Sequence, residues 1–171
     1  MEISKIKTIE DKKIKVVAGC TEGTILLFFQ PLIDRLQENQ PSKNLERFEI
    51  KRNVHHAEIT CIDSNKEFIV FGSADKHVSV WKMVGASLMQ KIKLDGGVSD
   101  LKFLPRMSHF VVLSDSGELD LCHPMHSSAV AESMISIDCE NGSLAVSSDN
   151  GVLIASQDGS CIRSYTYSAP A

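Results

Sequence analysis

The sequence lacks the features of a membrane protein or a secreted protein. No apolar run approaches the roughly 20 residues of a membrane-spanning helix, and the longest runs, such as the one in GTILLFFQ, have strand length. The N-terminal stretch MEISKIKTIEDKKIK is charged throughout and has no apolar core of a secretory signal. The five cysteines form no C-x-x-C pair, which favours buried thiols in a reducing compartment over a disulfide framework. We therefore expect a cytoplasmic protein without membrane insertion.

The sequence motifs of common enzymes are also missing. There is no glycine-rich phosphate loop, no paired-carboxylate motif and no Gly-x-Ser-x-Gly elbow. Aromatic residues make up only 6% of the chain and the net charge is −4, which argues against a nucleic-acid-binding face. We expect no catalytic residue, no cofactor and no nucleic-acid partner.

The sequence does contain a succession of short strand-like segments. Hydrophobic residues (43%) and charged residues (23%) occur at the frequencies of ordinary globular domains. Runs with alternating apolar positions are broken every 8–12 residues by turn signals. Only residues 31–40, PLIDRLQENQ, read as a helix, because Leu32, Ile33 and Leu36 share one face. The pattern predicts an all-β fold with a helix-like insertion at 31–40.

The turns recur in the same setting four times. Each follows a strand that ends in small residues and precedes a second alternating strand. These turns are TEG at 21–23, ADK at 74–76, DSG at 115–117 and DNG at 149–151. The opening strands begin near Ile3, Ile59, Val98 and Met134, at spacings of 56, 39 and 36 residues. A period near 40 residues with four short strands per unit is typical of propeller blades.

We therefore expect a single propeller-like domain over residues 1–171, with about four four-stranded blades. The first spacing exceeds the others because the first unit contains the helix-like insertion. The predicted blades are 3–52, 53–95, 96–132 and 133–168.

Residues 55–82, HHAEITCIDSNKEFIVFGSADKHVSVWK, resemble a WD repeat. The residues that match the spacing of the family are His55, Gly72, Ser73, Asp75 and Trp81. Val54 and Lys82 stand where the family usually has Gly and Asp. The other three units keep the turn and the hydrophobic rhythm but little of the motif. The resemblance implies a WD-repeat β-propeller.

In that family the matching His, Ser, Asp and Trp form a hydrogen-bonded chain inside one blade. The resemblance implies the structural lock Trp81–Ser73–His55–Asp75, in which buried indole, hydroxyl and imidazole groups satisfy one another. The same residue types could form a Ser–His–Asp hydrolase triad. However, Ser73 lies within a strand segment rather than on an exposed nucleophile turn, and no oxyanion loop is evident. We therefore favour the structural interpretation.

Two weaker patterns concern metals and aspartates. LCHPMHSS places Cys122, His123 and His126 close together, but no second ligand pair has suitable spacing, so we expect no metal site. An aspartate recurs in the opening strands, at Asp63, Asp100 and Asp138. We interpret this recurrence as a feature of the repeat and not as chemistry.

The resemblance implies a non-catalytic scaffold that docks proteins on its loops and blade edges. In the unit at 55–82 the corresponding positions are Glu58, Thr60, Ala74 and Lys76. Residues 107–171 carry eight acids against Arg163 alone, a balance of −7, whereas residues 1–106 have a balance of +3. This asymmetry favours a basic or neutral protein partner. The alternative is an enzyme built on a propeller scaffold, since fold does not fix function.

Four blades are fewer than the seven of a usual WD-repeat ring. An open arc leaves two apolar blade faces exposed, and such surfaces associate. We expect a compact four-blade ring, self-association or completion by a partner chain, or further blades in a longer protein, and we favour the last. Such a chain resembles the propeller portion of a large scaffold, as in BEACH-domain proteins, and would have no independent function.

Overall fold

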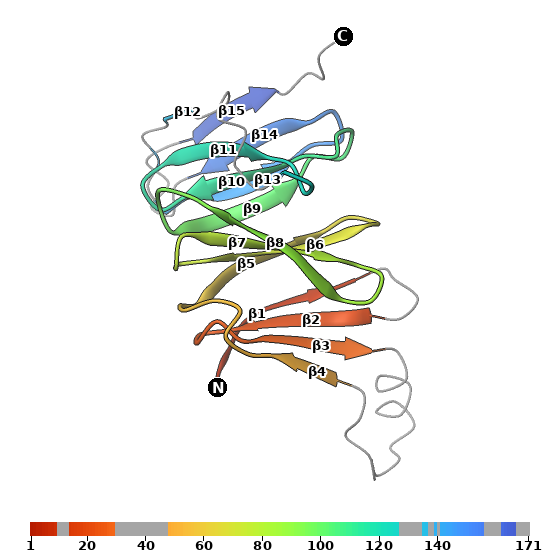
Figure 1. Ribbon diagram of the computed structural model, residues 1–171. Coiled ribbons are helices and arrows are strands. Elements are labelled where there is room, and N and C mark those ends of the chain that lie inside the picture. Colours follow the sequence, from red (N-terminus) through yellow and green to blue (C-terminus); the bar gives the residue numbers. More distant parts are fainter. Residues whose placement is uncertain are drawn as a thin grey trace.

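The computed structural model describes residues 1–9, 14–29, 48–126, 135–136, 139, 141–155 and 162–166. These residues form fifteen strands in four antiparallel sheets, and they include no helix that could span a membrane. The sheets are stacked in chain order, from β1–β4 at one end to β13–β15 at the other (Figure 1). The predicted all-β fold is confirmed, and the helix-like segment 31–40 lies outside the described residues.

The first sheet, blade 1, has the order β1-β2-β3-β4. Its strands are β1 (Ile3–Thr8), β2 (Ile14–Cys20), β3 (Ile25–Phe29) and β4 (Phe48–Lys51). The turn between β2 and β3 needs a residue in the left-handed region, and Gly23 adopts a φ of 78° there. Alternate residues of β2 and β3 face opposite sides of the sheet, so blade 1 has an apolar side chain layer on each face.

Blade 2 is the best-ordered unit of the sequence pattern and has the order β5-β6-β7-β8. Its strands are β5 (Ile59–Ser64), β6 (Phe68–Ser73), β7 (His77–Lys82) and β8 (Ser87–Lys93). Every residue of β6 is buried because it lies in the middle of the sheet, between the two neighbouring blades. At the other end of β6, Asn65 Oδ1 accepts hydrogen bonds from the backbone N–H groups of Glu67 and Phe68, which stabilises the tight turn.

Blade 3 has the order β9-β10-β11-β12, and it corrects one predicted boundary. Its strands are β9 (Val98–Phe103), β10 (Phe110–Ser114), β11 (Glu118–Cys122) and β12 (Ile135–Ser136). We predicted that the segment near Met134 opens the fourth blade. Instead β12 pairs with β11, so this segment is the outer strand of blade 3, and the blade extends past the predicted end at 132.

The last sheet, blade 4, has three strands among the described residues, where four were predicted. They are β13 (Ser143–Val146), β14 (Gly151–Ala155) and β15 (Ile162–Thr166). Because β12 belongs to blade 3, blade 4 begins at Ser143 and not at 133. The outer strand that completes each of the other blades has no counterpart in the part of blade 4 that the structure describes.

The hydrophobic core lies between the sheets and not within them. Three clusters join blade 1 to blade 2, blade 2 to blade 3, and blade 3 to blade 4. The first strands of the sheets, β1, β5, β9 and β13, contact one another in succession and line a common channel. Four cysteines, Cys20, Cys61, Cys122 and Cys139, are free and buried. This architecture is a partial propeller, in which blades 1 and 4 are the open ends.

Candidate functional site

A buried hydrogen-bond chain links four side chains of blade 2. The indole N–H of Trp81 donates to Ser79 Oγ at 3.0 Å, and the same hydroxyl lies 2.9 Å from His55 Nε2. His55 Nδ1 lies 3.1 Å from each carboxylate oxygen of Asp75. His55 and Ser79 are almost completely shielded from solvent, so each polar atom of this chain finds its partner inside the protein. We call these four residues the lock.

The lock contains His55, Asp75 and Trp81 as the sequence predicted, but its hydroxyl comes from Ser79 and not from Ser73. Strand register explains the correction. Trp81 pairs with Ile69, which is four residues, roughly 13 Å, from Ser73 along β6. Ser79 precedes Trp81 by two residues on the same strand, so both side chains lie on one face of the sheet.

Ser73 has another role, at the turn that follows β6. Its hydroxyl donates to the carbonyl of Ala57 at 3.2 Å and accepts the backbone N–H of Asp75 at 3.1 Å. It is fully buried, and both contacts are to backbone groups. Ser73 therefore holds the turn, and among the described side chains it does not form a triad with His55.

Burial and hydrogen bonds shift the charges of the lock in opposite ways. Burial lowers the pKa of His55, although Asp75 acts in the other direction. Burial alone would raise the pKa of Asp75, but hydrogen bonds from the His56 N–H, from His55 and from the His77 N–H keep it below its ordinary value. The lock is therefore held as a carboxylate beside a neutral imidazole at neutral pH.

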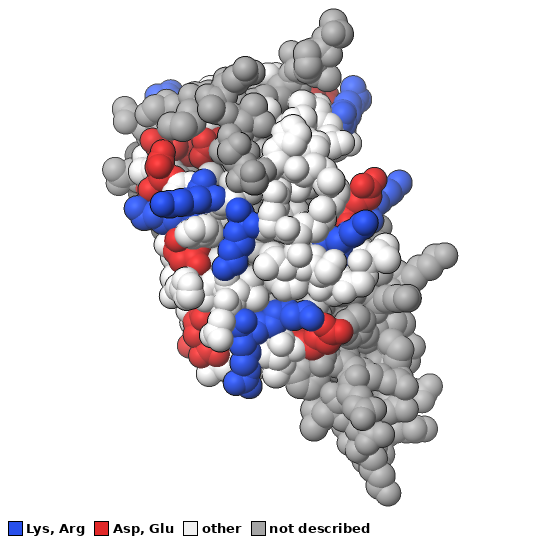
Figure 2. Space-filling model, viewed as in Figure 1, with Lys and Arg blue, Asp and Glu red and all other residues white. Residues whose placement is uncertain are grey.

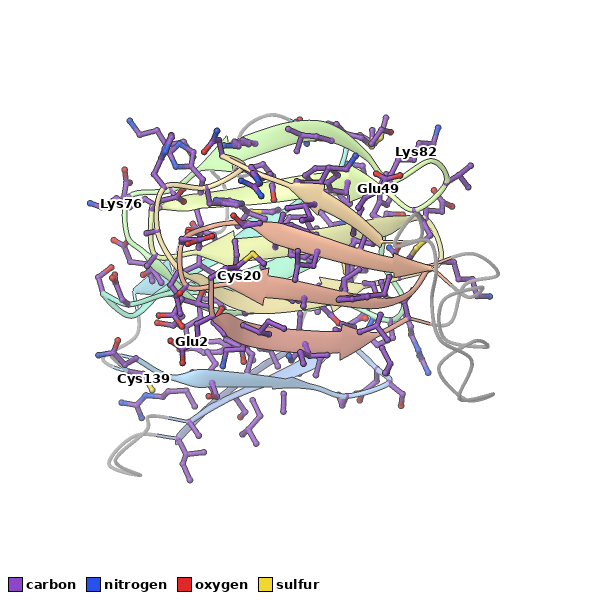
Figure 3. All side chains as sticks on the ribbon, turned by 90° about the horizontal axis from the view of Figure 1, so that it is seen from below. Glu2, Cys20, Glu49, Lys76, Lys82 and Cys139 are labelled. Atoms are coloured by element: carbon purple, nitrogen blue, oxygen red, sulfur yellow. The ribbon has the colours of Figure 1, made fainter. Side chains whose placement is uncertain are left out.

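The lock fixes the loop before β5 against the turn after β6. The carboxylate of Asp75 accepts the backbone N–H of His56 at 2.9 Å, and Ala74 N–H donates to the carbonyl of Glu58 at 3.0 Å. Glu58 and Ala74 are both exposed, so these bonds place two surface residues side by side. Figure 3 shows Lys76, from the same turn, at one end of the blades and Lys82 at the opposite end.

Four blades enclose a cavity of about 510 Å³ at the Lys76 end of the channel, which we call the channel mouth. The residues that line it are Lys5, Glu58, Thr60, Ala74, Gly97, Val98, Ser99, Asp115, Asn141, Gly142 and Ser143. Each blade contributes a residue from its first strand or from the loop before it. The mouth carries the carboxylates of Glu58 and Asp115 against one ammonium group, that of Lys5, and is otherwise formed by small and polar residues.

Three of the four residues that we predicted to contact a partner line the channel mouth. Glu58, Thr60 and Ala74 belong to it, whereas Lys76 does not. Lys76 Nζ instead donates to the carbonyl of Asp95 at 3.0 Å, on the segment that leads to blade 3. The sequence reasoning missed Asp115, although the repeat contained the signal: Asp115 opens the DSG turn at the position that Ala74 has in the ADK turn.

Hydroxyl groups on the first strands join neighbouring blades. Ser4 Oγ donates to the carbonyl of Ile59 at 2.7 Å, and Thr60 Oγ1 donates to the carbonyl of Val98 at 2.5 Å. Each hydroxyl sits at an irregularity in the pairing of its strand, between Ile3 and Lys5 in one case and between Ile59 and Cys61 in the other. The hydroxyl of Thr60 is therefore engaged in holding blades together, and its methyl group is the part left for a partner.

Two of the recurring aspartates also join blades. Asp63 accepts the backbone N–H of Phe103 at 2.7 Å, and Asp100 accepts that of Leu144 at 2.8 Å. Asp63 additionally pairs with Lys7 of blade 1 at 2.8 Å. The predicted equivalence of these aspartates is only approximate, since Asp100 and Asp63 occupy different register positions. Asp138 lies outside the described residues.

Three histidines gather on blade 3, away from the channel. The ring of His123 lies 4.9 Å from that of His109 and 4.6 Å from that of His126. Cys122 is buried beside them, and burial raises the pKa of its thiol to about 12. Among the described residues, no group of three or more His, Cys, Asp or Glu has the geometry to hold a metal ion.

The charged side chains on the surface in Figure 2 do not form a broad patch of one sign. Lysine and arginine side chains lie next to aspartate and glutamate side chains over the face shown. A protein that follows a phosphate backbone needs a continuous basic stripe. The face in Figure 2 does not have one.

Comparison with known proteins supports the repeat and the fold. The family described as WD domain, G-beta repeat, matches residues 48–82, which run from β4 to the end of β7. This match therefore joins the outer strand of blade 1 to three strands of blade 2. No curated protein matches the chain.

Three solved structures have the same arrangement of strands. The WD40 β-propeller domain of Doa1 is 12% identical, with a TM-score of 0.74, over 97% of this chain and 51% of that chain. A chain of the mitotic checkpoint complex is 14% identical, with a TM-score of 0.72, over 92% of this chain and 47% of that one. The computationally designed Ika4 protein is 19% identical, with a TM-score of 0.68, over 97% of this chain and 91% of that one.

The present chain thus spans about half the length of the Doa1 and mitotic checkpoint chains that it matches. At these identities the likeness shows the fold alone, and the sequence match identifies the repeat. Together, the WD repeat at 48–82 and the stacked four-blade architecture place the chain in the WD-repeat β-propeller family, as a partial propeller.

Proposed function

We propose that the chain is a non-catalytic protein-interaction scaffold that docks a basic segment of a partner protein at the channel mouth. The observation that carries the proposal is the mouth itself. It is a cavity of about 510 Å³ on a rigid frame, and it places Glu58 and Asp115 where a lysine or arginine side chain could enter. A basic side chain of the partner would add charge attraction to the shape of the cavity.

The rigidity of the mouth supports docking by a pre-formed surface. The lock fixes Glu58 and Ala74, and the Thr60 hydroxyl bond fixes blade 2 against blade 3. A site whose geometry exists before binding loses little conformational freedom when a partner arrives. One of the matched structures, a chain of the mitotic checkpoint complex, shows that this fold occurs within a protein assembly.

The geometry of blade 2 also supports a non-catalytic role. Ser73 is completely buried and bonded to backbone groups, and both ring nitrogens of His55 are engaged in the lock. A nucleophile and its base must be able to reach a substrate. The four free and buried cysteines support the cytoplasmic location that we include in the proposal.

The test compares what the immobilised chain retains from a cytosolic extract with what a mouth variant retains. The double variant Glu58→Gln and Asp115→Asn removes both carboxylates of the mouth. A matched control, Glu22→Gln with Glu67→Gln, removes two exposed acids that do not line it. We expect at least one protein whose recovery falls tenfold or more with the mouth variant and is unchanged with the control.

The same design separates the docking module from the alternative enzyme. If recovery of every protein is equal for the wild type and the mouth variant, docking at the mouth is wrong. If divalent metal ions raise the thermal unfolding temperature and a chelator lowers it, the enzyme alternative gains support. A docking module without a metal site should unfold at the same temperature in both conditions.

A further inference from the structure

The two end faces of the arc are of different kinds. We call the face of a blade that points to the next blade its leading face and the opposite face its trailing face. At each joint inside the chain a leading face packs on a trailing face. For example, Val17, Ile25 and Leu27 of blade 1 pack on Ile69, Phe71 and Trp81 of blade 2. Blade 1 therefore ends the arc with a trailing face, and blade 4 ends it with a leading face.

The trailing face of blade 1 is apolar across all four strands. Ile6, Ala18, Leu26 and Ile50 are consecutive cross-strand partners and so share this face. Ala18 and Leu26 belong to a cluster whose members all come from blade 1. Ile6 at the edge of that cluster is 65% exposed. Figure 3 looks at the arc from the blade 1 end, with β1–β4 in the foreground.

The leading face of blade 4 is also apolar, but it is shallow. Ala145 and Leu153 pair across β13 and β14, and Ile162 extends the same face on β15. Leu153 is 46% exposed and Ile162 is 66% exposed. Small residues around Leu153, among them Gly151, Ser164 and Thr166, form a groove in which a larger side chain could lie.

These observations make the ends complementary in shape and in charge. A trailing face with large side chains suits a leading face with a groove, as at the internal joints. The C-terminal third, 107–171, has a charge balance of −7, and the rest of the chain has a balance of +3. Opposite charges at the two ends attract a second copy that arrives head to tail and repel one that arrives tail to tail.

We propose that two copies of this chain close into one ring, with the leading face of each blade 4 on the trailing face of the other blade 1. A head-to-tail contact produces a closed ring when its rotation closes and a filament when it does not. The arc matches about half of the WD40 propeller domain of Doa1, so two arcs make up one ring. If the proposed function holds, such a ring has two channel mouths at the same end.

The experiment measures the mass of the full chain by light scattering during size exclusion, at about 20 and 200 µM. We expect twice the 18.8 kDa of one chain at both concentrations. Ile6→Asp and Leu153→Asp, one on each end face, should each give a folded monomer. Val84→Asp is the matched control, because Val84 is 75% exposed on the β7–β8 turn of blade 2 and should leave the dimer intact.

Cross-linking then tests the orientation. A short bis-maleimide should join Ile6→Cys to Leu153→Cys when the two single variants are mixed, and should join neither variant to itself. Wild-type chain, whose four described cysteines are buried, gives the background. A monomer at 200 µM, a cross-link formed by Ile6→Cys alone, or a mass that keeps growing with concentration would each overturn the closed head-to-tail ring. The mouth variant of the docking test leaves both end faces unchanged, so failure of docking and failure of the ring can be told apart.

Discussion

The indole N–H of Trp81 donates to the hydroxyl of Ser79, two residues earlier on the same strand, at 3.0 Å. The same hydroxyl contacts His55, whose other nitrogen faces Asp75. One serine thus connects the only tryptophan of the chain to a turn at the far end of β7. Since that turn supplies Ala74 to the channel mouth, the buried lock and the proposed docking surface depend on each other.

Ser79→Ala should destabilise the chain more than Ser73→Ala. The first change leaves the Trp81 N–H and His55 Nε2 without a buried partner, which should lower the free energy of unfolding by about 2–3 kcal/mol. The second removes one bond to a carbonyl and one from a backbone N–H at a turn, for about 1 kcal/mol. Urea unfolding of the two variants measures the difference, and a larger effect for Ser73→Ala would contradict the assigned register.

Asp75→Ala should cost about 2–4 kcal/mol of unfolding free energy, because the carboxylate accepts bonds from two backbone N–H groups and from His55. Trp81→Ala should cost about as much, since it removes a large buried side chain as well as a donor. Chemical denaturation with a matched control at exposed Lys82 checks both values. A change within about 0.5 kcal/mol of wild type for either variant would mean that blade 2 is not held by this lock.

Stability should fall as the pH is lowered from 7.5 to 5. Burial lowers the pKa of His55, His109 and His123 in the folded chain, so the unfolded chain takes up protons first. The stabilisation is therefore complete above the unfolded value of about 6.5 and is lost as the pH falls towards the folded values. Asp75 adds a further loss below about pH 4, because its folded pKa is lowered.

The measurement is the urea midpoint at the two pH values. The double variant His109→Gln and His123→Gln should show a smaller decrease than the wild type, because two of the three buried imidazoles are gone. His56→Gln, at an exposed position, should behave as the wild type does. A midpoint that is equal or higher at pH 5 would contradict the assignment of these histidines as neutral in the folded chain.

Gly19→Ala should destabilise the joint between blades 1 and 2. A methyl group at Gly19 would overlap the side chain of Ile59, which crosses from blade 2. Overpacking of this kind typically costs about 1–3 kcal/mol. Ile59→Ala, combined with Gly19→Ala, should recover part of that loss, and a double-mutant cycle in urea measures the coupling. Strictly additive effects would mean that the two residues do not touch.

Asp63→Ala should cost more than Lys7→Ala, although the two side chains form one ion pair. The aspartate also accepts the backbone N–H of Phe103, which would be left buried without its partner, for about 1–3 kcal/mol. Lys7 is about a third exposed, so its loss should cost less than about 1 kcal/mol. Equal losses in thermal unfolding would show that the link from blade 2 to blade 3 contributes little.

Local sequence features predicted the all-β fold, the turns and most of the lock. The turns were visible because ADK and DSG follow strands of similar length, and His55, Asp75 and Trp81 were visible from their spacing. The choice between Ser73 and Ser79 depends on how β6 and β7 are aligned. A serine at either position reads the same in one dimension, so this detail required the register.

The boundary between blades 3 and 4 was wrong for a related reason. The segment MISIDC alternates apolar and polar residues equally well as the first strand of a blade or as the last strand of the previous one. Only its pairing with β11, a contact with a neighbouring hairpin, shows that Ile135–Ser136 closes blade 3. Similarly, the inclusion of Asp115 in the channel mouth depends on how blades 2 and 3 are juxtaposed.

The lock in blade 2 is the feature on which the fold assignment and the proposed docking surface both rest. The single tryptophan allows a direct test, because its indole N–H gives one resolved signal in a nitrogen-edited NMR spectrum. We predict that this proton exchanges with solvent at least a hundredfold more slowly than in a free peptide. Ser79→Ala should accelerate its exchange tenfold or more, and Ser73→Ala should have a smaller effect. Exchange at the free-peptide rate in the wild type, or acceleration by Ser73→Ala alone, would contradict the lock.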